Sequence, residues 1–212
     1  MVYRPARLRL QGLIFPMKYT PSERLKAMQE ALGIDGTKPY QSAPAPKQIA
    51  SDYLDLQNKG LTKIPDLSGY GNLRGLDLRF NEIEKIEGLD NLSNLEILEF
   101  AGNEISKIEG LSKLGKLSEL WIDSNRITKI EGLENLTNLT TLILGNNKIT
   151  KLECLYNLKK LESIYLEHNI ISQIDGLENL SSLKYIGLSG NPIDKNDPVI
   201  AKLKVRGVQV NI

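Results

Sequence analysis

The segment at residues 76–97, LDLRFNEIEKIEGLDNLSNLEI, has an apolar pattern that changes its period part-way along. Leu76 and Leu78 are two residues apart, a step that is typical of a strand with alternate side chains on one face. The later apolar residues are three apart: Ile83, Ile86, Leu89, Leu92 and Leu95. Steps of three favour a tight, irregular or 3₁₀-like return. The segment therefore predicts one coil, a short strand and its return, which cannot bury its apolar face alone.

Copies of this coil follow one another along the chain with a spacing of 22 residues. Their first apolar position is occupied in turn by Leu54, Leu76, Leu98, Leu120, Leu142, Ile164 and Ile186. An asparagine recurs where each coil leaves its strand, at Asn81, Asn103, Asn125, Asn147, Asn169 and Asn191. Its amide offers two donors and an acceptor to backbone groups that would otherwise stay unpaired inside the stack. We interpret these asparagines as structural.

The repeated pattern resembles the leucine-rich repeats of the 22-residue class, which is known from the nuclear regulatory subunit of protein phosphatase-1 and from the internalin repeat domains. The resemblance implies an α/β solenoid, a right-handed superhelix with a parallel sheet on its concave side. It also implies a protein that binds other macromolecules and is not a catalyst. Fold alone does not name the partner.

The two ends of the array carry signals of caps. Thr20-Pro21-Ser22-Glu23 is a capping box with proline at the first helical position, and it predicts a helix over residues 20–33 that covers the first coil or docks a partner. At the other end, Asp197-Pro198 predicts a short helix, and alternation at Val208, Val210 and Ile212 predicts a final strand. The caps are expected to hide the apolar ends of the solenoid.

These signals divide the chain into five segments. Residues 1–19 are interpreted as a disordered or non-native extension, because Met17 can itself be a start codon. Residues 20–33 form the amino-terminal capping helix, and 34–53 a proline-containing linker. Residues 54–195 are the leucine-rich repeats, and 196–212 the carboxyl-terminal cap.

Composition argues against several classes of function. The net charge is +1 with 25% charged residues, so no bulk charge attracts nucleic acid or an anionic membrane. No apolar run approaches the ~20 residues of a membrane span. The chain has one histidine and one cysteine, Cys154, and no phosphate-binding glycine loop. We expect no enzyme, no metal, no cofactor and, given the lone cysteine, a cytoplasmic location.

Strand alternation assigns the side chains that point away from the core. The first outward row is Tyr53, Gly75, Ile97, Glu119, Thr141, Ser163 and Tyr185. The second row is Asp55, Asp77, Glu99, Trp121, Ile143, Tyr165 and Gly187. The third row is Gln57, Arg79, Ala101, Asp123, Gly145, Glu167 and Ser189. Phe80 and His168 follow at the strand ends.

An apolar group with acidic surroundings stands out in these rows. Trp121, Ile143 and Tyr165 are successive members of the second row, and the fold requires no apolar residue on a face that is open to water. The three rows contain six acidic residues and one basic residue, Arg79. We therefore expect an aromatic and aliphatic anchor with an acidic rim. The predicted contact residues are Phe80, Ile97, Glu99, Trp121, Asp123, Ile143, Tyr165, Glu167, His168 and Tyr185.

The predicted partner is a protein or peptide with an apolar knob in basic surroundings, bound by a monomer without nucleic acid or membrane. Five alternatives stay open. The aromatic residues serve only to stiffen the sheet through cross-strand contacts, or the face is covered by a second copy or by the chain's own connector at 34–51. The family resemblance adds a regulatory subunit of a protein phosphatase and a nucleic-acid-associated adaptor, although acids on the face would repel phosphates.

Overall fold

The computed structural model describes residues 8–10, 13–15 and 52–212. The chain divides into two units, Met1–Ile49 and Ala50–Ile212. In the first, strand β1 (Leu8–Leu10) pairs antiparallel with β2 (Leu13–Phe15). The expectation of a disordered or non-native extension over residues 1–19 stays a prediction. The helix predicted over 20–33 and the linker up to residue 51 lie outside the described residues.

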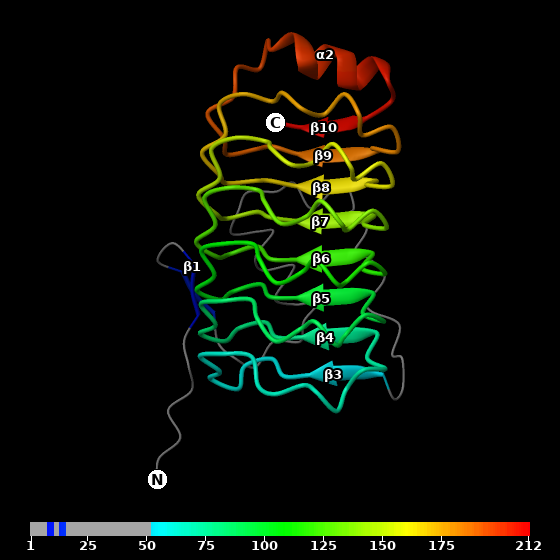
Figure 1. The fold of residues 1–212 in the computed structure, drawn as a ribbon. Helices are drawn as coiled ribbons and strands as arrows, with labels where there is room; N and C mark the ends of the chain where they lie inside the picture. Colours follow the sequence, from blue (N-terminus) through cyan, green and yellow to red (C-terminus); the bar gives the residue numbers. More distant parts are fainter. Residues whose placement is uncertain (1–7, 11–12, 16–51) are drawn as a thin grey trace. The chain divides into compact units, whose positions relative to one another are not determined.

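The second unit is built on one parallel sheet, in which each strand has three residues and pairs with the next strand along the chain (Figure 1). The strands are β3 (Tyr53–Asp55), β4 (Gly75–Asp77), β5 (Ile97–Glu99), β6 (Glu119–Trp121), β7 (Thr141–Ile143), β8 (Ser163–Tyr165), β9 (Tyr185–Gly187) and β10 (Gln209–Asn211). Leu76 pairs with Leu54 and Leu98, 22 residues before and after it. The predicted solenoid and its register are confirmed.

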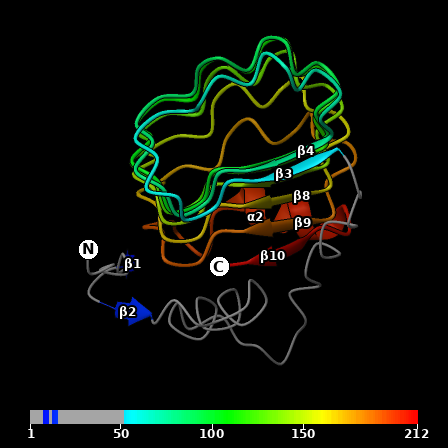
Figure 2. The same cartoon turned by 90° about the horizontal axis from the view of Figure 1, so that it is seen from below.

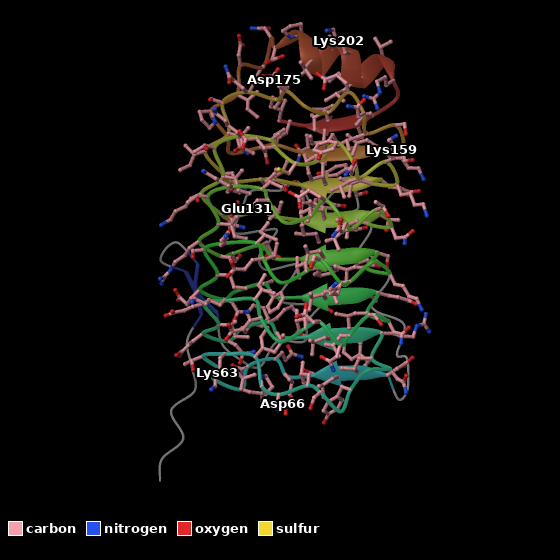
Figure 3. All side chains as sticks on the ribbon, in the orientation of Figure 1. Lys63, Asp66, Glu131, Lys159, Asp175 and Lys202 are labelled. Atoms are coloured by element: carbon pink, nitrogen blue, oxygen red, sulfur yellow. The ribbon has the colours of Figure 1, made fainter. Side chains whose placement is uncertain are left out.

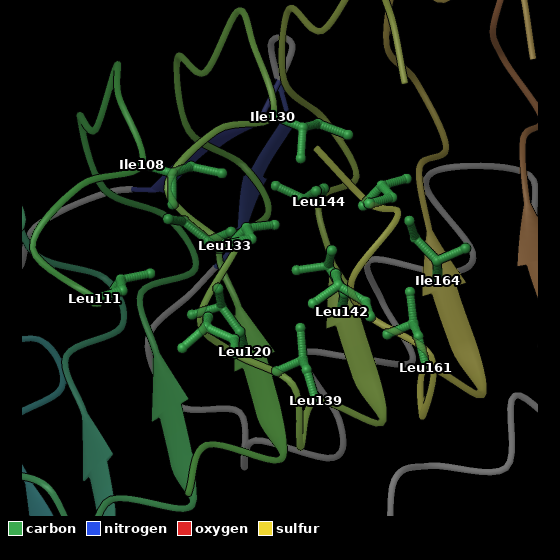
Figure 4. Close-up of a cluster of buried hydrophobic side chains, with 14 of the residues drawn as sticks. Ile108, Leu111, Leu120, Ile130, Leu133, Leu139, Leu142, Leu144, Leu161 and Ile164 are labelled. Carbon is green, nitrogen blue, oxygen red and sulfur yellow. The ribbon is translucent and has the colours of Figure 1, made fainter. Parts of the chain in front are cut away.

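The returning part of each coil is made of tight turns, as the steps of three predict. The N–H of Leu92 donates to the carbonyl of Leu89, and that of Leu95 donates to Leu92, both at 2.9 Å. Seen along the stack, the coils overlie one another with the strands on one side of a ring (Figure 2). The leucines and isoleucines of the template fill this ring, and Leu120, Leu142 and Ile164 lie in one row of the core (Figure 4). A continuous apolar core therefore runs through all the coils.

The asparagine column bonds each coil to the one before it. The Nδ2 of Asn125 donates to the carbonyls of Phe100 and Ile122 at 3.0 and 3.2 Å. Its Oδ1 accepts from the N–H of Ile105 at 2.9 Å. The same arrangement recurs at Asn103, Asn147 and Asn169, which are all buried. The interpretation of these residues as structural is confirmed.

The carboxyl-terminal end has a helix and a strand, in the order that the sequence predicts. Helix α2 (Pro198–Val205) begins after Asp197, whose carboxylate accepts from the N–H of Val199 at 2.8 Å. Ile200 and Leu203 are buried in the same apolar cluster as the coils, and β10 pairs with β9. These residues thus extend the core beyond the last coil.

Glycine recurs at a second position, in the returning part of the coils, at Gly88, Gly110, Gly132 and Gly176. Gly110 and Gly132 have φ of +69° and +70°, and a Cβ on them would come within 2.4 and 2.6 Å of backbone carbonyls in the preceding coil. Cys154 occupies this position in its coil with φ of +57°. A side chain in the left-handed region costs roughly 1–2 kcal/mol. Cys154 is therefore a departure from the template that lowers stability.

Replacement of Asn125 by alanine should lower the free energy of unfolding by about 3 kcal/mol. It removes the amide from four buried backbone groups. The three carbonyls keep another donor, but the N–H of Ile105 is left without its acceptor, and an unsatisfied buried group costs about 1–3 kcal/mol in addition to the lost bonds. Urea denaturation measures the change. The control is Asn135→Ala, which removes only an exposed 3.4 Å bond to the Ser112 carbonyl and should change stability by less than about 0.5 kcal/mol. Equal losses in the two variants would contradict the role assigned to the column.

Replacement of Cys154 by glycine should raise the free energy of unfolding by about 0.5–1 kcal/mol. The free energy gained by removing a side chain from the left-handed conformation exceeds the free energy lost because glycine makes the unfolded chain more flexible. Gly132→Ala is the reciprocal variant, and it should lose at least about 2 kcal/mol because its methyl group meets a carbonyl. Thermal and urea unfolding compare them. A less stable Cys154→Gly variant would refute the template argument.

Candidate functional site

The outward surface of strands β3 to β9, which we name the sheet face, consists of the three rows that alternation predicts. Strand pairing places Trp121 beside Ile143, and Ile143 beside Tyr165. Ile97 pairs with Glu119, and Ser163 with Tyr185, so the first row also runs across the sheet in the predicted order. The predicted juxtapositions of the rows are therefore present.

The apolar patch consists of Trp121, Ile143 and Tyr165, with Ile97 and Tyr185 on either side. The two tyrosine rings lie 4.8 Å apart between centroids and are inclined by 36°. The Nε1 of Trp121 donates to Glu119 at 3.4 Å. Ile143 is 7% exposed, and the other four residues are half-buried. The patch thus combines cross-strand packing with accessible apolar surface, and the expectation of a fully open face is wrong for Ile143.

Four carboxylates of the rows are more deeply buried than the sequence suggests. Asp77 and Glu99 are each 1% exposed, Asp123 is 3% and Glu167 is 5% exposed. The expectation of an exposed acidic rim is therefore wrong for Glu99, Asp123 and Glu167. For Glu167 the reason is local, because Gly187 leaves space on the sheet and the carboxylate lies across it. A Cβ on Gly187, for example, would fall within 1.8 Å of the Glu167 carboxylate.

On strands β4 and β5 the negative charge of two buried carboxylates, Asp77 and Glu99, is balanced by an arginine. Arg79 bonds Asp77 through Nη2 at 2.6 Å and Glu99 through Nε at 2.8 Å. The hydroxyl of Tyr53 donates to the other oxygen of Glu99 at 3.0 Å. Burial raises the pKa of Glu99 to about 7, against the opposing effect of Arg79. Burial also raises the pKa of Tyr53. We name Asp77, Arg79 and Glu99 the arginine cluster.

A second buried group, Asp123 and Glu167, has no cation. The hydroxyl of Ser124 donates to Asp123 at 3.3 Å, and that of Tyr185 donates to Glu167 at 3.3 Å. Among residues 52–212 neither carboxylate is in an ion pair. Burial raises the pKa of Asp123 to about 6 and also raises that of Glu167. The negative charge here is therefore poorly solvated, and it is offset only by the weaker effect of Arg79, which lowers the pKa of Asp123.

The residues that follow the third row form a left-handed column at the strand ends. Its members with positive φ are Asn58, Phe80, Gly102, Ser124, Asn146, His168 and Gly190. Glycine and asparagine suit this conformation and histidine also occurs in it, whereas a bulky residue such as Phe80 is an outlier. The Phe80 ring lies where a Cβ on Gly102 would be, and the His168 ring lies where one on Gly190 would be. Phe80 and His168, the predicted contact residues at the strand ends, thus each have a glycine beside them in the next coil.

Metal binding has no support in the described part of the chain, which holds no group of three histidine, cysteine or acidic residues able to coordinate an ion. No described helix is long and apolar enough to cross a membrane. The buried acids and the apolar patch are the chemical groups that this surface offers.

Comparison with known proteins agrees with this architecture. The leucine-rich repeat family profile matches residues 68–175. The chain belongs to the leucine-rich repeat family. A search of curated protein sequences gave no match.

Solved structures of leucine-rich repeat proteins are similar to the chain. The internalin inlF from Listeria monocytogenes is 32% identical with a TM-score of 0.62, over 70% of this chain and 44% of its own. Internalin C2 from the same organism is 31% identical with a TM-score of 0.58, over 76% of this chain and 79% of its own. The TLR13 protein in a complex with the RNA ssRNA13 is 30% identical with a TM-score of 0.52, over 65% of this chain and 20% of its own.

The stability of this leucine-rich repeat protein should fall as the pH rises, and Asp123→Asn should remove part of that loss. A carboxyl whose pKa is raised on folding binds its proton more tightly in the folded state, so its stabilising effect is full below pH 4 and is lost as the pH rises through about 6. The shift corresponds to about 2–3 kcal/mol. The variant should exceed the wild type by that amount at pH 8 and match it at pH 4 in urea denaturation. A wild-type advantage at pH 8 would contradict the burial argument.

Proposed function

We propose that this leucine-rich repeat protein binds a protein or peptide partner through its sheet face, with the apolar patch as the anchor. The observation that carries the proposal is the contiguity of Trp121, Ile143 and Tyr165 on neighbouring strands, with part of the surface of Trp121 and Tyr165 accessible. Contiguous apolar surface of this kind marks interaction sites more often than chance placement does. Leucine-rich repeats commonly mediate protein–protein interaction, which supports the same reading.

The patch is the main source of binding free energy in this proposal. A tryptophan side chain buries about 150–250 Å² in full. Because Trp121 is already half-buried, docking removes about 100 Å² from water, a gross gain of about 2–3 kcal/mol. Tyr165 and Tyr185 add their own remaining surface. The acids contribute selectivity, because negative potential rejects acidic partners and steers basic ones.

A nucleic-acid partner is the second candidate, and it rests on the RNA complex of TLR13. The charge of the sheet face weighs against it, since the rows hold six acids and only Arg79 as a base. Phosphates would meet this negative potential. A catalytic role gains nothing from the geometry, so we propose a binding role alone. Regulation of a phosphatase and a cytoplasmic location stay predictions from the sequence.

The proposal predicts that Trp121→Ala and Tyr165→Ala each reduce capture of a partner at least tenfold. The full chain, immobilised, is incubated with lysate, and quantitative mass spectrometry compares the proteins retained by each variant. Loss of an anchor at the centre of an interface typically costs more than about 1–2 kcal/mol. Circular dichroism and thermal unfolding establish that the variants are folded.

The matched control is Tyr156→Ala, which removes an exposed aromatic residue from the returning part of a coil. It should retain the wild-type partners. The proposal that the apolar patch anchors a partner is wrong if Trp121→Ala and Tyr165→Ala are both folded and keep every partner. Recovery of RNA in place of protein, with a steep loss on adding salt, would favour the nucleic-acid candidate instead.

A further inference from the structure

We propose that Glu167 is a positioning residue of the sheet face: through the hydroxyl of Tyr185 it holds the Tyr185 ring against Tyr165 in the apolar patch. The inference rests on the proposed function, and it names the residue that fixes the aromatic part of the anchor. In this role Glu167 does not contact the partner, although the sequence predicts it as a contact residue, because its carboxylate is buried.

The bond between Tyr185 and Glu167 crosses the sheet face. Tyr185 is the first residue of β9, and Glu167 follows Tyr165, the last residue of β8, by two positions. The hydroxyl of Tyr185 donates to Oε1 of Glu167 at 3.3 Å. Because Tyr185 belongs to the first row and Glu167 to the third, the two side chains must span the second row to meet. Tyr165 is the member of that row on β8, so the bond is made beside it.

Gly187 supplies the space for this bond. It is the member of the second row on β9 and pairs with Tyr165. A Cβ on Gly187 would overlap the Glu167 carboxylate, so a side chain at this position would displace the group that accepts from Tyr185. The glycine and the acid therefore belong to one arrangement on β8 and β9.

The consequence for the apolar patch is a fixed pair of rings. The centroids of Tyr165 and Tyr185 lie 4.8 Å apart, within the range of roughly 4.5–7 Å at which aromatic rings attract each other. With its hydroxyl bonded to Glu167, the Tyr185 ring is held at both ends, and Tyr165 lies between this ring and Ile143. A side chain that is ordered before binding loses less conformational freedom when the partner docks. Glu167 thus favours binding without touching the partner.

A carboxylate suits this role because a charged acceptor bonds a hydroxyl more strongly than a neutral acceptor does. Burial raises the pKa of Glu167, and the bond from Tyr185 opposes that shift because it favours the ionised form. Burial and the charge of Glu167 raise the pKa of Tyr185, so the hydroxyl keeps its proton. The pair therefore keeps one donor and one acceptor, and the buried acid has a reason in the binding surface.

The other end of the sheet offers a matched control. The hydroxyl of Tyr53 donates to Glu99 of the arginine cluster at 3.0 Å, and its ring lies where a Cβ on Gly75 would be. This bond also joins a tyrosine of the first row to a buried glutamate. Tyr53 lies on β3 and Tyr165 on β8, however, so loss of the Tyr53 hydroxyl should leave the Tyr165 ring in place.

The first test observes the Tyr165 ring in the full chain. Fluorotyrosine is incorporated, and fluorine NMR follows the Tyr165 signal, which is assigned by its loss in Tyr165→Phe. We expect Glu167→Ala and Tyr185→Phe to shift this signal alike, and the double variant to shift it no further, because both remove the same bond. Glu167→Gln, whose amide oxygen still accepts, should restore most of the wild-type signal. Tyr53→Phe should leave it unchanged.

The second test measures binding with peptides as probes. Dodecapeptides are selected by phage display on the wild-type chain, and those that bind less tightly to Trp121→Ala are kept as ligands of the patch. Fluorescence anisotropy of the labelled peptides gives the Kd. Glu167→Ala and Tyr185→Phe should each weaken binding about threefold to tenfold, because the rings must then be ordered on docking. Glu131→Ala removes a glutamate from the loop side of the coils (Figure 3) and should bind as the wild type does.

The outcomes separate the positioning role from the proposed function. Peptides that depend on Trp121 but bind Glu167→Ala and Tyr185→Phe as tightly as the wild type would overturn the positioning role and leave the anchor standing. A Tyr165 signal that is unchanged in both variants, or additive effects in the double variant, would overturn it too. Tyr185→Phe keeps the ring and changes no charge, so it tests the role even where Glu167→Ala fails to fold. Indifference of every selected peptide to Trp121→Ala and Tyr165→Ala would overturn the proposed function itself.

Discussion

Backbone hydrogen bonding at the point where each coil leaves its strand is the constraint on which this structure depends. Inside the stack no water is present to bond those groups, and an unpaired buried N–H or carbonyl costs about 1–3 kcal/mol. The asparagine column meets the need coil by coil, because one amide bonds a carbonyl of its own coil and two groups of the coil before it. Since each amide reaches only the adjacent coil, the strands and the turns that follow them must stay aligned from one coil to the next.

Fixed register explains which parts of the surface the sequence could predict. Once Leu76, Leu98 and Leu120 are aligned, the residues beside them must form rows across the sheet, and strand pairing at Trp121 and Tyr165 agrees with this. The repeat period carries that information. It says nothing about how far a side chain reaches along the sheet, so the contact of Tyr53 with Glu99, two coils away, could not be read from it.

The burial of the acids was missed for the same reason. Alternation gives the side of the sheet on which a residue lies, but depth depends on the neighbouring side chains. The available signal was two glycines of the rows: Gly75 creates space for the Tyr53 ring, and Gly187 creates space for the Glu167 carboxylate. Likewise, the glycines after the strands at Gly102 and Gly190 are the counterparts of Phe80 and His168. A glycine in one of these rows thus indicates that a neighbouring side chain lies over it, and the position can be recognised in the sequence once the repeat period is known.

Residues that depart from the repeat pattern at a cost in stability are distinguished from residues that the fold itself requires. Asn58, Gly102, Asn146 and Gly190 meet the left-handed column at little cost, so the backbone itself gives no reason for Phe80 or His168 there. Asp123 and Glu167 are also costly, because a neutral residue of similar shape would be better tolerated when buried. A solenoid tolerates such costs, since its stability is a sum over coils and a loss of about 1–3 kcal/mol in one coil is shared by contacts on both sides. Phe80, Asp123, His168 and Glu167 lie on the sheet face or at its edge, whereas Cys154 lies on the returning part of its coil. The fold accounts for none of the four residues at the sheet face, and the proposed binding role gives a reason for their position.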